Sequence, residues 1–250
     1  MKDRSRDKPH LYGVDGCPAG WIVVSAMAVG NRLAGLNVEI IPDFGALLDM
    51  AGPDAIISVD MPIGLPERIE GPGRGPEQAA RPHLGARQSS VFSIPSRRAV
   101  YAGDYRQACA IALETSDPPK KVSKQAFNIF PKIREIDTAL RNQGGAGNVH
   151  ETHPELAFWS LNNGEAMQLP KKIKSRVNPA GMAERRALLA RHGFDREFLE
   201  TRPPRGSAAD DFLDACACLA IAARISRGIA NPYPEDFAHD AHGLPVAIWA

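Results

Sequence analysis

The segment Ala55-Ile56-Ile57-Ser58-Val59-Asp60 decides the fold, because it is apolar at nearly every position and ends in an acid. A strand with this pattern is covered on both faces, which places it in the middle of a sheet. Met61-Pro62-Ile63-Gly64-Leu65-Pro66 follows and cannot continue a hydrogen-bonded ladder. The segment therefore predicts a central strand with a carboxylate at its end.

The N-terminal part of the chain predicts an antiparallel meander with strands at 11–15, 21–29 and 36–41. The first of these, Leu11-Tyr12-Gly13-Val14-Asp15, also ends in an acid. Asp15-Gly16 between apolar runs is equally typical of a hairpin turn, so Asp15 is open to interpretation as a turn residue or as a ligand. Asp43 is expected to cap a short helix after the meander.

Residues 67–100 are rich in Gly, Pro and Arg and predict a long loop. Loops of that length are uncommon unless they cover a functional site or are disordered. A final helix is predicted from Ser207 to Arg227, with Asp210 completing a capping box. Between the loop and this helix, the patterns predict helices at 104–115 and 123–141, a strand at 148–152, and helices that open at Pro154 and at Asn178-Pro179.

Strands followed by alternating strands and helices predict an α/β protein. We expect a mixed sheet, an antiparallel meander and then parallel strands, with helices on both faces. One domain is predicted over 10–230, with a helical and loop insertion at about 67–145. Residues 1–9 are predicted to be a disordered tail, and residues 231–250 a C-terminal extension.

Composition limits the possible partners and compartments. The formal net charge is +1 over 250 residues, so the chain lacks the general basic footprint of a nucleic-acid-coating protein. No apolar run reaches the roughly 18 residues of a membrane helix, and the N-terminus lacks a signal-peptide pattern. The four cysteines lack C-x-x-C spacing and indicate reduced thiols, so we expect a cytoplasmic protein. The oligomeric state is undetermined, and a homodimer stays open.

Acidic side chains at the ends of apolar elements are the strongest functional signal. An ionised carboxylate in such a setting costs several kcal/mol unless it is paired. Asp15 and Asp60 end apolar strands, Glu151 ends a shorter one, and Asp211 and Asp214 lie on the last helix. If these acids converge, they either raise one another's pKa strongly or need a cation, and oxygen ligands favour Mg²⁺ or Mn²⁺. Such a site can activate water and stabilise the leaving oxygen of a phosphodiester.

Several residues keep a structural alternative. Asp60 also fits a loop or capping acid, and Asp210 fits a helix-capping charge better than a ligand. His150, His153 and Glu155 compete with Glu151 for its role. A basic cluster is more typical of a solvated loop than of a phosphate-binding patch, and it comprises Lys171, Lys172, Lys174 and Arg176.

Five motifs, in order, resemble the family called domain of unknown function 429, over about residues 11–228. They are Gly13-Val14-Asp15-Gly16-Cys17 with Gly20-Trp21, Val59-Asp60-Met61-Pro62-Ile63-Gly64-Leu65-Pro66, Ser89-Ser90-Val91-Phe92 with Pro95-Ser96-Arg97, Glu151-Thr152-His153-Pro154-Glu155, and Asp210-Asp211-x-x-Asp214-Ala215. The family is regarded as predicted ribonuclease H-like nucleases, and the arrangement is similar to Holliday-junction resolvases and ribosomal-RNA maturation nucleases.

The resemblance implies roles for individual residues. Asp15, Asp60 and Glu151 would be metal ligands on the first, fourth and fifth strands, and Asp211 and Asp214 would be ligands on the final helix. Independently of the resemblance, the residue types of the long loop are suited to hold a phosphate backbone, and a merely basic loop is an equal alternative. Side chains expected to contact the substrate are Arg87, Ser89, Ser90, Arg97 and His153. The Pro- and Gly-rich segment after Asp60 and the insertion behind it depart from the known nucleases.

The leading prediction is a metal-dependent nuclease for structured nucleic acid, with Asp15, Asp60, Glu151 and Asp214 as catalytic residues. One alternative is an actin-like phosphotransferase or ATPase, although the sequence contains no second acid-glycine hairpin of the kind such enzymes need. The other is a non-catalytic nucleic-acid-binding module, because a fold does not determine a function.

Overall fold

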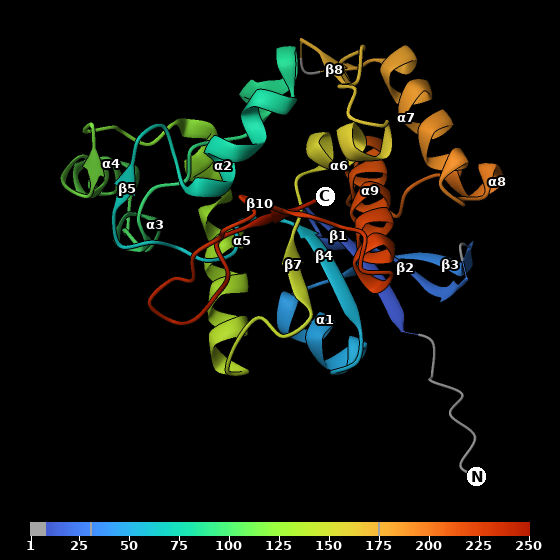
Figure 1. Ribbon diagram of the computed structural model, residues 1–250, viewed down its shortest axis with the longest axis horizontal. Coiled ribbons are helices and arrows are strands. Elements are labelled where there is room, and N and C mark those ends of the chain that lie inside the picture. Colours follow the sequence, from blue (N-terminus) through green and yellow to red (C-terminus); the bar gives the residue numbers. More distant parts are fainter. Residues whose placement is uncertain (1–8, 31, 175) are drawn as a thin grey trace.

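The computed structural model describes residues 9–30, 32–174 and 176–250. The predicted tail at 1–9 therefore lies outside the described residues, except for Pro9. The described chain forms a seven-stranded mixed sheet in the order β10-β11-β7-β4-β1-β2-β3 (Figure 1). In chain order its strands are β1 (His10–Cys17), β2 (Gly20–Val29), β3 (Arg32–Ile41), β4 (Ile56–Asp60), β7 (Val149–Glu151), β10 (Pro232–Tyr233) and β11 (Ile248–Trp249).

The strand directions follow the predicted pattern. β1, β2 and β3 pair antiparallel, and β4 then pairs parallel with β1 on one side and with β7 on the other. Strand β4 is thus the central strand that its continuous apolar run predicts. The mixed α/β architecture is confirmed, and it is consistent with a ribonuclease H-like fold.

Helices cover both faces of the sheet, as predicted (Figure 1). On one face, α1 (Phe44–Ala51) and α5 (Lys124–Asn142) contribute Phe44 and Phe130 to a core that contains Val14 and Val59. On the other face, Leu11 and Ile22 pack with side chains of three helices, α6 (Pro154–Leu161), α7 (Pro179–Arg191) and α9 (Ala209–Ser226). A one-turn helix, α8 (Arg196–Leu199), lies beside α7.

The alternation of side chains along β1 and β4 decides which residues face α9. Neighbouring strand residues point to opposite faces. Val14 and Val59 face α1 and α5, whereas Leu11 and Ile56 pack on the side of α9. Asp15 and Asp60 share the parity of Leu11 and Ile56, so both carboxylates lie on the α9 side.

Gly13 allows α9 to cross β1 at close range. A Cβ atom at this position would lie 2.1 Å from both the Ala215 carbonyl oxygen and the Leu219 nitrogen. These are backbone atoms of α9 that no rotamer change can move, so any larger residue would push the helix away from the sheet. The absence of a side chain at Gly13 therefore brings the first turns of α9 to the end of β1.

The segment 67–100 is ordered into short elements, so the prediction of a long loop was wrong. Arg74 is buried in this segment and forms ion pairs with Glu77 and with Glu151 of β7, so it links the segment to the sheet. Single-turn helices rich in Gly and Pro lack a hydrophobic period long enough to detect. The elements are β5 (Ile69–Glu70), α2 (Gly75–Ala80), η1 (Arg81–His83), η2 (Gly85–Ser90) and α3 (Arg97–Val100), and they are followed by α4 (Tyr105–Glu114) and β6 (Ser116–Asp117).

The C-terminal segment, predicted as an extension at 231–250, completes the sheet. Strand β11 pairs parallel with β7, with Ile248 opposite Glu151, and β10 pairs antiparallel with β11. These strands are too short to show an alternating pattern in the sequence. Among the described residues, no helix combines the length and the apolar character needed to cross a bilayer.

Candidate metal centre

Asp15 and Asp60 are neighbours because β1 and β4 are parallel and in register. The pairing runs from Leu11 opposite Ile56 to Asp15 opposite Asp60. Strand β1 continues to Cys17, which pairs with Gly20, so the chain turns at Pro18-Ala19. The alternative interpretation of Asp15-Gly16 as the hairpin turn is therefore wrong.

Asp214 joins these two residues from the second turn of α9. One carboxylate oxygen from each of Asp15, Asp60 and Asp214 lies within 4.8 Å of the other two. In the part of the chain that the structure describes, this is the one group of three or more possible ligands that are this close. We call Asp15, Asp60 and Asp214 the acidic triad.

The triad concentrates negative charge in a buried place. Burial of the carboxyl group and the charge of Asp214 raise the pKa of Asp60 to about 8. Burial also raises the pKa of Asp15 well above its ordinary value, and the charge of Asp60 adds to this effect. Three carboxylates with these pKa values cannot all ionise near neutral pH without a compensating cation.

Lys171 supplies such a cation. Its ammonium group forms an ion pair with Asp214 Oδ2, and the Lys171 side chain remains 28% exposed, against 4% for Asp214. Burial lowers the pKa of Lys171, but the pair with Asp214 outweighs this effect and holds the pKa above its ordinary value. The other oxygen, Asp214 Oδ1, is buried and has no hydrogen-bond partner among the described residues.

The backbone around Lys171 is held by α7 and by the residue that precedes it. The Asn178 backbone N–H donates to the Lys171 carbonyl at 2.8 Å, and the Asn178 side-chain amide donates to the Pro170 carbonyl at 2.8 Å. The fully buried Arg185 donates to the Leu169 carbonyl at 2.9 Å. Lys171 then leads into the short hairpin of β8 (Lys172–Ile173) and β9 (Arg176–Val177).

The triad fits a hard divalent cation. All of its donors are carboxylate oxygens, which Mg²⁺ and Mn²⁺ prefer, and Asp214 Oδ1 is a buried acceptor still free to bind one. Ligand oxygens around an octahedral ion of this size are about 3–4 Å apart, so a small change of side-chain torsion would bring these three into range. Lys171 occupies part of the same negative site and would have to share it or leave.

Glu151, predicted as a fourth ligand, is not part of the triad. It pairs in register with Val59 rather than with Asp60, so it lies outside the triad, although it lines the same cleft as Asp15 and Asp60. There, Arg74 Nη2 binds Glu151 Oε1 at 2.7 Å, and the Ile63 backbone N–H donates to Oε2 at 2.7 Å. Burial raises the pKa of Glu151 to about 7, although Arg74 opposes this shift.

Asp211 and Asp210 act at the start of α9. The helix begins at Ala209, two residues after the predicted cap, and Asp211 accepts the Ala208 backbone N–H at 2.9 Å. The capping box predicted for Ser207 and Asp210 is therefore wrong by one residue. Asp210 pairs instead with Lys172 Nζ at 2.5 Å. Asp211 lines the cleft beside the triad without joining it.

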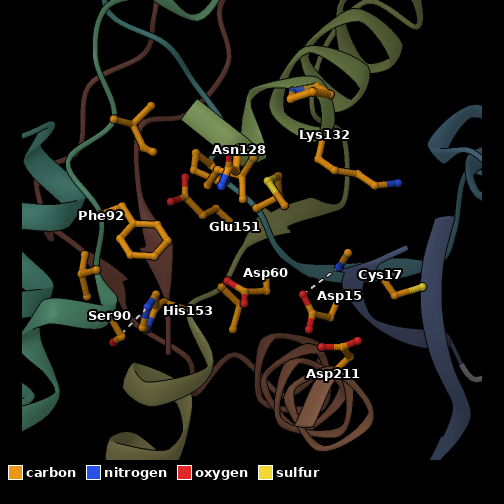
Figure 2. Close-up of a pocket in the computed structure, with 18 of the residues that line it drawn as sticks. Asp15, Cys17, Asp60, Ser90, Phe92, Asn128, Lys132, Glu151, His153 and Asp211 are labelled. Carbon is orange, nitrogen blue, oxygen red and sulfur yellow. Dashed lines mark hydrogen bonds between the residues drawn. The ribbon is translucent and has the colours of Figure 1, made fainter. Parts of the chain in front are cut away.

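A cleft of about 860 Å³ opens beside Asp15 and Asp60. Figure 2 shows Asp60 between Asp15 on one side and Phe92 and His153 on the other. Of the five residues predicted to contact substrate, Ser90 and His153 line this cleft.

Three of the residues predicted to contact substrate are not among those that line the cleft. Arg97 is buried in ion pairs of 2.5 Å with Asp137 and Asp240, so its charge is already compensated. Ser89 lines a separate hollow, and Arg87 lies in η2. All three residues lie in the segment next to the cleft, but the short helices η2 and α3 direct their side chains elsewhere.

Three further residues have roles that the predictions from the sequence do not include, namely Lys171, Arg74 and Phe92. Lys171 belongs to the basic cluster whose composition is typical of a solvated loop, but Lys171 and Lys172 instead pair with acids of α9. Arg74 and Glu77 are three residues apart, on either side of the Gly75-Pro76 helix start. This spacing is the sequence signal for the buried ion pair in the insertion. Phe92 lines the cleft, although an isolated aromatic residue in a Pro- and Ser-rich segment gives no signal of this position.

Comparison with protein families supports the resemblance inferred from the motifs. A family model described as "Protein of unknown function (DUF429)" matches residues 13–239, a range that contains the acidic triad. Comparisons with curated proteins and with solved structures find no match. The chain therefore belongs to the DUF429 family of proteins of unknown function.

Proposed function

We propose that this protein is a metal-dependent phosphodiester hydrolase, a nuclease that uses Mg²⁺ or Mn²⁺ held by Asp15, Asp60 and Asp214. The observation that carries the proposal is the convergence of three carboxylates, within 4.8 Å of one another, beside a cleft of about 860 Å³. Nucleic acid is the proposed substrate, and the buried, free thiols agree with a cytoplasmic location.

A bound divalent ion in this place would supply Lewis acidity and a water of lowered pKa. The residues of the chain would position the ion and bind the substrate. Asp15 and Asp60 hold their carboxylates on adjacent strand ends, and Gly13 keeps α9 close enough for Asp214 to reach them. Lys132 lines the cleft, and its ammonium group, 3.5 Å from Glu135, suits the non-bridging oxygens of a phosphate better than that of Lys172, which pairs with Asp210 at 2.5 Å.

The test is cleavage of labelled single-stranded, duplex and branched oligonucleotides of DNA and of RNA. We expect cleavage with Mg²⁺ or Mn²⁺, none in a chelator, and a loss of at least about 100-fold in Asp60→Asn. Asp49→Asn, on the exposed side of α1, is the matched control for removal of one carboxylate charge. Absence of metal-dependent cleavage, or equal cleavage by Asp60→Asn, would refute the proposal.

The two alternatives predict different results in the same experiments. An actin-like phosphotransferase would turn over ATP and leave the oligonucleotides intact. A non-catalytic binding module would bind them equally well with and without metal, and Asp214→Asn would leave that affinity unchanged.

A further inference from the structure

The wall of the cleft that faces the acidic triad is apolar and aromatic. Phe92 is half-buried in this wall and packs against the core on the α1 and α5 side. Other apolar side chains that line the cleft are Met61, Val91, Ile94, Ile129 and Pro131. Phosphate oxygens bind hydrogen-bond donors and cations, so an apolar and aromatic surface would not contribute to the binding of phosphate alone.

Polar groups also line the cleft. Asn128 and Ser90 are among them, and the Ser90 hydroxyl donates to the Arg87 carbonyl at 2.8 Å and lies 3.4 Å from His153 Nε2. Burial lowers the pKa of His153 to about 4, so its imidazole ring is neutral at pH 7. Figure 2 shows the Phe92 ring and the His153 ring on the same side of Asp60.

From this combination we infer that the cleft holds a single unpaired nucleobase against Phe92 while the attached phosphate lies at the acidic triad. This inference rests on the proposed function for the position of the phosphate and extends it to the class of substrate. A flat aromatic base suits the face of Phe92, and base–aromatic stacking accepts any base because every base has a π-face. The amide of Asn128 offers a donor and an acceptor for the base edge.

Two observations favour an unpaired base over a base within a duplex. The cleft volume, about 860 Å³, lies in the range of small-molecule sites and suits one base that has left the double-helical stack. The net charge of +1 also lacks the excess of basic residues with which proteins bind the phosphates of a long duplex. The ligand chemistry is therefore a nucleoside phosphate, supplied either free or at an unpaired position of a strand.

Calorimetric titration with AMP and with ribose 5-phosphate tests the inference, in Mn²⁺ and in chelator. We expect AMP to bind about tenfold more tightly or better, since a stacked base adds that much affinity. Phe92→Leu should abolish the difference, and Phe92→Trp, which keeps an aromatic face, should preserve it. Phe127→Leu is the matched control, because Phe127 is also half-buried against the same core but does not line the cleft.

Equal affinity for AMP and ribose 5-phosphate, no binding of either, or no effect of Phe92→Leu would overturn the inference. A single-stranded hexanucleotide and a blunt hairpin duplex identify the source of the base. Tighter binding of the single strand than of AMP indicates a base within a strand, and the reverse indicates a free nucleotide. Binding of the duplex as tight as that of the single strand would also overturn the inference. A base-dependent affinity without any hydrolysis would reject the nuclease proposal and leave the base site intact.

Discussion

The ammonium group of Lys171 pairs with Asp214, the triad residue contributed by α9, while the neighbouring Lys172 pairs with Asp210 one turn earlier on the same helix. Two adjacent lysines thus meet two acids, but only Asp214 belongs to the triad. Lys171 therefore stands where a divalent cation would compete with it, and Lys172 does not.

Replacement of Lys171 by Met should raise the affinity for Mn²⁺ by about tenfold, because it removes a cation that occupies the same negative site. In chelator, the variant should melt at a lower temperature than the wild type, since Asp214 loses its partner. Lys172→Met should leave Mn²⁺ affinity unchanged. Calorimetric titration with Mn²⁺ measures the affinity of both variants. Weaker Mn²⁺ binding by Lys171→Met would show that Lys171 does not compete with the ion.

Gly13→Ala should lower the melting temperature by about 5–10 °C, because the new Cβ meets the α9 backbone at 2.1 Å and overpacking costs about 1–3 kcal/mol. It should also weaken Mn²⁺ binding by moving Asp214 away from Asp15. Gly16→Ala is the control, since its Cβ would contact side-chain atoms of Met61 and Lys132 at 3.6 Å or more. Equal melting temperatures for the two variants would contradict this account of α9.

Arg74→Met should destabilise the protein by about 3–5 kcal/mol, because it leaves Glu77 and Glu151 buried without their shared partner. Chemical denaturation measures the loss. Arg98→Met removes an exposed guanidinium 3.7 Å from Glu114 and should cost under about 0.5 kcal/mol. The double variant Arg74→Met/Glu151→Gln should recover part of the loss, and no recovery would argue against the buried pair as the cause.

The metal-free protein should become less stable as pH rises from about 4 to 8. The pKa of Asp60 is raised from 3.8 to about 8 by burial and by Asp214, so in this window the folded state keeps a proton that the unfolded state has released. Stability falls with pH wherever the folded state binds more protons. Melting temperatures in chelator between pH 5 and pH 8 test this, and Asp60→Asn should flatten the profile. An unchanged slope in Asp60→Asn would assign the effect to other groups.

The sequence predicted the positions of Asp15, Asp60 and Asp214 because each lies where a strongly apolar element meets a carboxylate. Their convergence follows from strand parity and from the parallel pairing of β1 and β4. The same reasoning fails for Glu151, because Glu151 lies opposite Val59 in the pairing of β7 with β4, one residue before Asp60. A pattern of period two cannot reveal which strand residues lie opposite each other.

The insertion was the least predictable part of the fold. Its short helices depend on tertiary contacts such as the Arg74 ion pairs, which local sequence patterns do not encode. The pairing of Lys171 with Asp214 could not be predicted for a similar reason, because a run of basic residues before an exposed hairpin has the composition of a solvated loop. Only the approach of α9 identifies which of those lysines meets a buried acid.

Mn²⁺ binding measured by electron paramagnetic resonance, which counts the free ion, tests the central claim most directly. The account predicts that the wild type binds Mn²⁺ and that Asp15→Asn, Asp60→Asn and Asp214→Asn each lose at least about tenfold in affinity, while Asp49→Asn does not. Mn²⁺ binding that is absent from the wild type, or unchanged in all three triad variants, would contradict it.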